Sequence, residues 1–301
     1  MSRPEHTRTN STNLSHGSRS LPLSGRVGIV TGASRGIGAA IARNLASKGC
    51  NLVLNYTSDS STTITEELAA DLEAEHGIQA VIVQANMGSE NGPKHIVEVA
   101  KNHFQHPKTG KFEIGVIINN AGVAGNNLIE NIDCEQFARQ YNINVRGPLL
   151  LMQAALPYLP HDRSGRIVNL SSVSSSLGYK TQSIYGGTKA ALEAMTRTWA
   201  RELAERATVN AINPGPVATD MYTSTDDDFV AQNKPHIENT PLATPRKGID
   251  PDDMCETSVK VGGRPAYSEE IAGVTGILCL PESGWTTGSV ICANGGMRFS
   301  F

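Results

Sequence analysis

The sequence predicts an α/β fold built on a doubly wound parallel sheet, and three observations support this prediction. Short apolar runs recur along the chain, separated by stretches with helical spacing. The runs are apolar throughout rather than alternating, which is typical of strands buried on both faces of a parallel sheet. A glycine-rich turn joins the first run to the first helical stretch. Right-handed crossovers would then place helices on both faces of the sheet.

The individual elements are predicted in chain order from these patterns. Strands are expected at residues 27–30, 51–56, 80–84, 114–119, 166–170, 208–212 and 289–293, because each is a short, largely apolar run. Helices are expected at residues 36–48, 64–75, 93–104, 135–159 and 185–206, where the spacing is helical. Gly77 is expected to end the second helix as a C-cap.

Two segments differ in amino-acid composition from the rest of the chain. Residues 1–20 are rich in Ser, Thr, Asn, Arg and His and are expected to form a disordered tail. A transit peptide is the less favoured alternative, because no amphipathic stripe is present. Residues 21–301 are expected to form a single domain. Within it, a polar stretch at about 221–268 carries five prolines and predicts a substrate lid.

Composition and charge exclude several classes of protein. The formal net charge of −3 does not favour a nucleic-acid or anionic-membrane partner. No apolar run reaches about 18 residues, so no membrane span is expected. The five cysteines are scattered, and the N-terminus lacks a signal-peptide core, which favours reduced thiols in a cytoplasmic protein. No His, Cys and Asp cluster has metal-ligand spacing, so no metal is expected.

The glycine-rich turn spans residues 31–38 and reads Thr-Gly-Ala-Ser-Arg-Gly-Ile-Gly. Glycines let the backbone approach a pyrophosphate closely, and the N-terminus of the following helix attracts anions. Such a turn can also serve only to pack a helix on a strand. Its position between the first strand and the first helix favours dinucleotide binding.

The spacing of this turn resembles the signature of the short-chain dehydrogenase/reductase family. Further signatures of that family follow in order: Asn119-Asn120-Ala121-Gly122, Asn144, Ser172, Tyr185-x-x-x-Lys189, Asn213-Pro214-Gly215-x-Val217-x-Thr219, Thr287-Gly288 and Gly295-Gly296. The resemblance extends from Leu21 to Gly296. It implies a Rossmann-like single domain, a nicotinamide cofactor and hydride transfer to or from a small organic molecule.

The residues at the end of the second strand predict NADP(H) rather than NAD(H). An acidic residue in NAD-preferring members of the family corresponds to Tyr56 here, so no carboxylate is present to bind the ribose 2′-hydroxyl. Arg35, with Thr57 and Ser58, is expected to bind a 2′-phosphate. The alternative for Arg35 is an ordinary surface charge.

The resemblance also assigns the remaining cofactor contacts. The glycine turn contributes Gly32, Ser34, Gly36, Ile37 and Gly38. The adenosine half is expected to lie against Asn86, Met87, Asn119, Ala121 and Gly122. The nicotinamide half is expected to lie against Tyr185, Lys189, Pro214, Gly215, Val217 and Thr219. Val217 and Thr219 would hold the carboxamide and so fix the face presented for hydride transfer.

Tyr185 is the expected catalytic acid or base. A free phenol ionises near pH 10, and Lys189 lies one helical turn further on the same face. Its ammonium, together with the positive nicotinamide of the oxidised cofactor, is expected to lower the pKa of Tyr185. By resemblance, Ser172 binds the substrate oxygen and Asn144 holds a water molecule that relays protons. Ser171 is the alternative for the serine.

The predicted function is NADP(H)-dependent reduction of a carbonyl in a polyketide, aromatic ketone or 3-oxoacyl compound. One alternative is an alcohol dehydrogenase acting in the oxidative direction. Another is a non-catalytic NADP-binding regulator, although such proteins tend to lose the tyrosine or the lysine. The resemblance also implies a homodimer or homotetramer. Residues 247–263 form an insertion relative to the family, which could cover the pocket, contact another subunit or be inert surface.

Overall fold

The computed structural model describes residues 21–225 and 227–299, so the predicted tail at residues 1–20 lies outside it. Seven parallel strands form one sheet in the order β3-β2-β1-β4-β5-β6-β7. They are β1 Val27–Val30, β2 Asn51–Tyr56, β3 Ala80–Gln84, β4 Val116–Asn119, β5 Gly165–Leu170, β6 Ala207–Ile212 and β7 Val290–Ile291. The predicted Rossmann-like, doubly wound sheet is confirmed.

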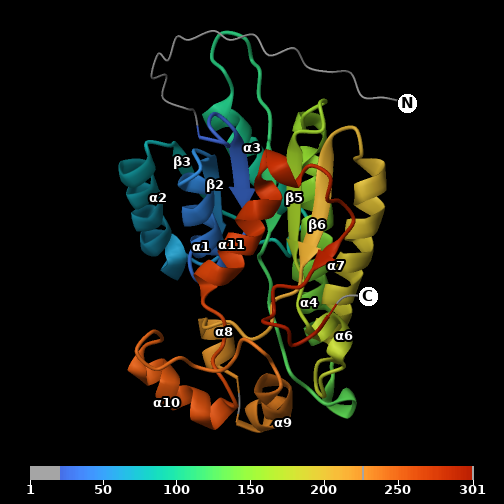
Figure 1. Cartoon of the computed structure of the whole chain (residues 1–301). Helices are drawn as coiled ribbons and strands as arrows, with labels where there is room; N and C mark the ends of the chain where they lie inside the picture. The colour runs from blue at the N-terminus through green and yellow to red at the C-terminus, as the bar shows by residue number, and fades with distance from the viewer. Residues whose placement is uncertain (1–20, 226, 300–301) are drawn as a thin grey trace, which may run out of the picture.

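Helices cover both faces of this sheet (Figure 1). One face carries α1 (Gly36–Ala46), α2 (Thr62–His76) and α11 (Ser268–Cys279), and the other carries α3 (Gly92–Phe104), α5 (Gly147–Ala155) and α7 (Ser183–Glu202). Neighbouring residues of a strand point to opposite faces, so Val30 packs in the first core and Ile29 in the second. Both cores are apolar, which is why the strand runs are apolar throughout.

The helix predicted at residues 135–159 is present over residues 134–158, but it is not a regular α-helix throughout. The segment divides into α4 (Cys134–Tyr141), a π-helix (Asn142–Arg146), α5 and a 3-10 turn (Leu156–Tyr158). Pro148 lies in the first turn of α5, and Pro157 is the second residue of the 3-10 turn. Proline has no N–H to donate, so the regular hydrogen-bond ladder is interrupted at these places. The π-helix is a local widening of the kind often found at functional sites.

The polar stretch predicted as a lid is itself largely helical. It contains α8 (Asp220–Thr223), α9 (Asp227–Glu238) and α10 (Asp252–Val261). Figure 1 shows these orange helices gathered beyond one end of the sheet. Pro251 is the N-cap of α10 and Gly262, with φ +90°, is its C-cap. The prolines therefore mark helix boundaries as well as loops, although Pro235 lies inside α9.

The strand order fixes where a ligand can bind. Successive crossovers run in opposite directions from β1, first to β2 and later to β4. A crevice opens outside the carboxyl ends of the strands at such a switch point. Across residues 21–225 and 227–299, no group of three or more His, Cys, Asp or Glu side chains is arranged to hold a metal ion. In the same residues, no helix has the length and apolar character needed to cross a membrane.

Candidate active site

A cavity of about 900 Å³ occupies the crevice at the carboxyl ends of the strands. The segments that follow β1, β2, β4, β5 and β6 all contribute to its wall, and α8 and α9 close its far side. It is lined by nearly all the residues predicted to bind a cofactor: Gly32, Ser34, Arg35, Gly36, Ile37, Gly38, Tyr56, Thr57, Ser58, Asn86, Met87, Ala121, Gly122, Tyr185, Lys189, Pro214, Gly215, Val217 and Thr219. These segments lie far apart in the sequence, and the parallel sheet brings them together at one edge.

The glycine turn is shaped so that the cavity reaches the backbone of α1. Gly36 begins the helix with φ +55°, a conformation that other residues rarely adopt. A Cβ atom on Gly38 would lie 2.1 Å from the carbonyl oxygen of Gly32, so no larger residue fits there. No side chain caps the N-terminus of α1, and its first turn has no acidic residue. Its N–H groups can therefore bind an anion.

The end of β2 carries hydroxyl groups at the cavity wall and no carboxylate at residues 56–58. Arg35, between the glycine turn and α1, also lines this part of the cavity. Its guanidinium donates to the carboxylate of Asp220 in α8 at 3.1 Å. Both side chains are more than half exposed. Arg35 is thus available to a ligand phosphate once it leaves this weak surface pair.

Ser172, Tyr185 and Lys189 converge on the cavity from β5 and α7. Ser172 follows the end of β5, while Tyr185 and Lys189 lie four residues apart on one face of α7. The Lys189 ammonium donates to the carbonyl oxygen of Leu170 at 2.7 Å and lies 5.6 Å from the centre of the Tyr185 ring. Tyr185 and Lys189 therefore lie at the same wall of the cavity as Ser172.

The prediction that Lys189, together with the positive nicotinamide, lowers the pKa of Tyr185 concerns the cofactor complex and stays a prediction. Burial raises the pKa of Tyr185 to about 12, and a hydrogen bond with Ser172 only partly opposes the shift. The Lys189 ammonium is directed to the Leu170 carbonyl. Burial also lowers the pKa of Lys189 to about 8. In both cases removal of water disfavours the charged form.

Asn144 lies behind the cavity rather than in its wall. It belongs to the π-helix and is 1% exposed. Its amide nitrogen donates to the Val123 carbonyl at 2.8 Å and to the Thr188 hydroxyl at 3.0 Å, while its oxygen accepts from the Val123 N–H at 2.9 Å. A Cβ atom on Gly122 would lie 3.4 Å from both the Asn144 oxygen and the Lys189 nitrogen. Asn144 is therefore close to the lysine and holds the loop after β4.

Asn119 does not line the cavity, although it was expected to bind the cofactor. It is the last residue of β4 and donates to the side-chain oxygen of Asn169 at 2.8 Å. Its neighbour Asn120 lines the cavity and donates to the carbonyl oxygen of Thr31 at 2.8 Å. Side chains alternate in direction along a strand, so the shift by one residue reverses which asparagine reaches the cavity.

Ser171 and Ser172, the two candidates for the catalytic serine, both line the cavity but differ in their hydrogen bonds. Ser171 donates to the carboxylate of Glu193 at 2.6 Å, and Ser175 donates to the same oxygen at 2.7 Å. The Ser172 hydroxyl donates to that of Ser174 at 3.1 Å, and its proximity to Tyr185 lowers the pKa of that phenol. Glu193 thus holds both flanks of the loop and leaves the middle hydroxyl for the cavity. Sequence reasoning missed this glutamate, which lies eight residues beyond Tyr185 on α7.

Known proteins are similar to this chain over most of its length. Residues 26–229 match the short chain dehydrogenase family. An L-xylulose reductase of Aspergillus niger is 51% identical over 298 residues, covering 92% of this chain and 99% of that protein. The chain belongs to the short-chain dehydrogenase/reductase family. An L-xylo-3-hexulose reductase of Hypocrea jecorina is 49% identical, over 93% of this chain and 98% of that protein.

The fold of this short-chain dehydrogenase/reductase is also similar to that of a solved structure. The crystal structure of angucycline C-6 ketoreductase LanV with bound NADP superposes with a TM-score of 0.77 at 28% identity. The match covers 94% of this chain and 99% of that one. The shared architecture therefore includes the lid end of the domain as well as the sheet.

The lid side of the cavity contains polar groups that sequence reasoning missed. Gln182, 8% exposed, donates to the side-chain oxygen of Asn126 at 3.1 Å. Its own side-chain oxygen and the Tyr222 hydroxyl are buried without a hydrogen bond to any described residue. Gln182 precedes Tyr185 by three residues, so the helical spacing of α7 was a signal that it shares the catalytic face. Tyr222 comes from α8 and had no such signal.

Proposed function

We propose that this enzyme uses NADPH to reduce the keto group of an open-chain, polyhydroxylated ketone. The observation that carries the proposal is a cavity in which Ser172, Tyr185 and Lys189 face a glycine turn suited to phosphate. Relatives that are about half identical are named for the reduction of keto sugars. These names favour a keto sugar over the polyketide, aromatic and 3-oxoacyl substrates expected from the sequence.

The residues present fit NADPH. The uncapped N-terminus of α1 suits the pyrophosphate. Arg35, Thr57 and Ser58 suit the 2′-phosphate, since Arg is the preferred partner of a phosphate and no carboxylate at the end of β2 repels it. Val217 and Thr219 are assigned to the nicotinamide carboxamide. A structural relative is described with bound NADP, in agreement with this assignment.

The substrate side offers hydrogen-bonding groups to a polyol. A buried polar atom without a partner is costly, and a substrate hydroxyl can supply the missing bond. The Gln182 oxygen can accept from one hydroxyl, and the Tyr222 hydroxyl can donate to or accept from another. An aromatic ketone without hydroxyl groups would leave both atoms unpaired.

Bound NADPH supplies the hydride that the carbonyl carbon receives. Tyr185 donates a proton to the carbonyl oxygen, and Ser172 donates a hydrogen bond that positions the same oxygen. The raised pKa of Tyr185, about 12, keeps the phenol protonated at neutral pH. A protonated phenol serves reduction directly, whereas alcohol oxidation would first require the phenolate. We propose the reductive direction, in agreement with the names of the two sugar-reductase relatives.

Steady-state reduction of L-xylulose with NADPH and with NADH tests the proposal. We expect turnover with L-xylulose and a clear preference for NADPH. A parallel series contains an aromatic ketone, a 3-oxoacyl ester and the corresponding alcohols with NADP⁺. Faster turnover of the aromatic or 3-oxoacyl compound would show that the keto sugar is not the preferred substrate class. No turnover in either direction, with intact NADPH binding, would favour the non-catalytic regulator.

A further inference from the structure

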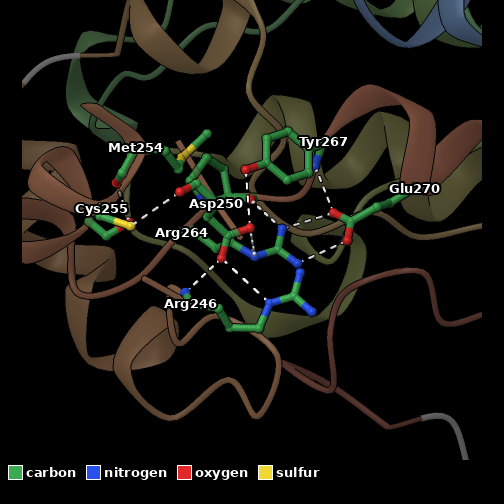
Figure 2. Close-up of polar contacts among 9 residues, drawn as sticks. Arg246, Asp250, Met254, Cys255, Arg264, Tyr267 and Glu270 are labelled. Atoms are coloured by element: carbon green, nitrogen blue, oxygen red, sulfur yellow. Dashed lines mark hydrogen bonds and ion pairs between the residues drawn. The ribbon is translucent and has the colours of Figure 1, made fainter. Parts of the chain in front are cut away.

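The segment at residues 247–263, predicted above to be an insertion relative to the family, contains a buried carboxylate, that of Asp250, at the centre of a polar network (Figure 2). The Asp250 side chain is 1% exposed. It accepts from the backbone N–H of Arg246 at 2.6 Å and from the Tyr267 hydroxyl at 3.2 Å. The guanidinium groups of Arg246 and Arg264 approach it to 3.5 and 3.8 Å. A carboxylate buried this deeply is tolerated only when it is paired.

Arg264 joins the insertion to helix α11. Its side chain is 8% exposed, and two of its nitrogens donate to the two oxygens of Glu270 at 2.9 Å each. The Tyr267 ring lies 5.1 Å from its guanidinium carbon. The fork of Arg264 is therefore fixed by Glu270 on one side and by Asp250 on the other (Figure 2). Lysine could not reproduce this two-point contact.

The backbone that carries Arg264 pairs with the segment assigned to the nicotinamide. The Ala266 N–H donates to the carbonyl oxygen of Pro216 at 2.9 Å, and the Ala218 N–H donates to that of Ala266 at 2.9 Å. Val217 and Ala266 thereby form a parallel bridge. The Arg264 N–H is held as well, by the carbonyl oxygen of Ala243 at 2.7 Å. Residues 264–266 thus form a short brace alongside residues 216–218.

The braced segment borders the cavity on its nicotinamide side. Val217 and Thr219 both line the cavity, and the Thr219 hydroxyl donates to the Val217 carbonyl at 3.2 Å. A Cβ atom on Gly36 would lie 3.2 Å from a methyl carbon of Thr219, so the segment packs closely on the glycine turn. A small displacement of residues 216–219 would change the shape of this part of the cavity.

We propose that Asp250 and Arg264 are positioning residues that hold residues 216–219 in place for the nicotinamide half of the cofactor. The insertion then has a defined role, which is to supply the carboxylate that fixes Arg264. This inference rests on the proposed function, because it takes NADPH as the ligand of the cavity. Neither side chain lines the main cavity, so both act through the backbone of residues 264–266.

The test compares two ligands that differ only in the nicotinamide half. Dissociation constants are measured for NADPH and for 2′-phospho-ADP-ribose, which lacks the nicotinamide, with wild type, Asp250→Asn and Arg264→Met. We expect both variants to bind NADPH about tenfold more weakly, the size of a coupling carried by a positioning residue. Binding of the fragment is expected to stay within about twofold of wild type, because its contacts lie on the other side of the cavity.

Two further variants separate positioning from general loss of structure. Asp71→Asn removes a carboxylate from an exposed pair with Arg43 at 3.2 Å, and it should change neither constant. Tyr267→Phe removes only the hydroxyl that donates to Asp250. It should therefore weaken the binding of NADPH by about threefold and leave the binding of 2′-phospho-ADP-ribose unchanged. It supplies the same comparison if Asp250→Asn does not fold.

The outcomes are distinct. Equal weakening of NADPH and fragment would overturn the inference, since a general structural role affects both ligands. Unchanged binding of NADPH in the folded variants would overturn it as well. Failure of the wild-type enzyme to bind NADPH would instead overturn the proposed function. Weaker binding of NADPH with unchanged binding of 2′-phospho-ADP-ribose supports both the inference and the proposed function.

Discussion

The two sides of the cavity are built in different ways. The glycine-turn side consists of residues next to one another in sequence, and its shape is set by the backbone: a positive φ at Gly36 and a close approach of Gly38 to Gly32. The lid side depends on side chains from segments far apart, such as Gln182 with Asn126 and Arg264 with Asp250. Local backbone geometry is encoded in short motifs, whereas long-range side-chain pairs are not.

This difference teaches how the enzyme can vary. A backbone cradle for a dinucleotide tolerates few substitutions, because a Cβ atom at Gly38 would collide with the main chain. The lid side can exchange one hydrogen-bonding residue for another without moving the sheet. We therefore expect cofactor preference to depend on a few fixed positions and substrate preference to depend on the lid.

The largest expected effect lies where the two sides meet, at Tyr185. Tyr185→Phe removes the proton donor and should lower kcat for ketone reduction by about a thousandfold. The affinity for NADPH should stay within about twofold, since the ring is retained. Stopped-flow reduction and fluorescence titration measure the two quantities. Tyr158→Phe, at a ring that packs on Phe112 away from the cavity, is the matched control.

The next effect concerns cofactor preference on the glycine-turn side. Arg35→Ser should reduce kcat/KM with NADPH by about thirtyfold, the loss of a charge-assisted contact with phosphate. The value with NADH should stay nearly constant. Arg43→Ser, further along α1 in an exposed pair with Asp71, provides the control. Equal losses with both cofactors would show that Arg35 acts on the fold of the turn rather than on the phosphate.

The pH dependence of reduction should report Lys189. Its pKa of about 8 means that the ammonium is lost as pH rises above that value. Tyr185, with a pKa of about 12, remains protonated over the same range. The phenolate formed by proton donation is then less stabilised, so kcat/KM should fall about tenfold between pH 7 and pH 9. A flat profile over this interval would contradict the assignment, and Lys189→Met should abolish the pH dependence.

Much of the fold and cofactor side could be predicted, because strand runs, the glycine turn and the spacing of Tyr185 and Lys189 are local patterns. The π and 3-10 turns within the helix at residues 135–159 could not be predicted, since helical spacing of apolar residues does not distinguish them from α-helical turns. The exchange of Asn119 for Asn120 reflects the alternating direction of side chains at the end of β4, which the sequence motif does not specify. The raised pKa of Tyr185 could not be predicted from spacing, because burial is its main cause.

The lid was the least predictable part. Its polar composition indicated a loop, whereas the structure contains helices α9 and α10 there. The Asp250–Arg264 pair joins residues whose proximity no spacing rule specifies. The homodimer or homotetramer and the cytoplasmic location stay predictions, as they concern partners and surroundings rather than the chain itself.

A smaller effect is expected from the lid side. Gln182→Met and Tyr222→Phe should each lower kcat/KM for L-xylulose by about fivefold, because each removes one hydrogen bond to a substrate hydroxyl. A ketone of the same length without distal hydroxyls should be reduced by wild type and variants at similar rates. Gln79→Met, at an exposed position outside the cavity, is the control. Equal losses on both ketones would show that these residues shape the cavity instead.

The smallest effect should come from the contact that joins the two sides at the surface, between Arg35 and Asp220. Asp220→Asn removes an exposed ion pair, which contributes little to stability. Its loss frees the guanidinium, so NADPH should bind about twofold more tightly, most clearly at low salt. Affinity for NADH serves as the internal control and should not change. A marked loss of NADPH affinity would mean that the pair closes the lid over the cofactor, and the two sides would then be coupled rather than independent.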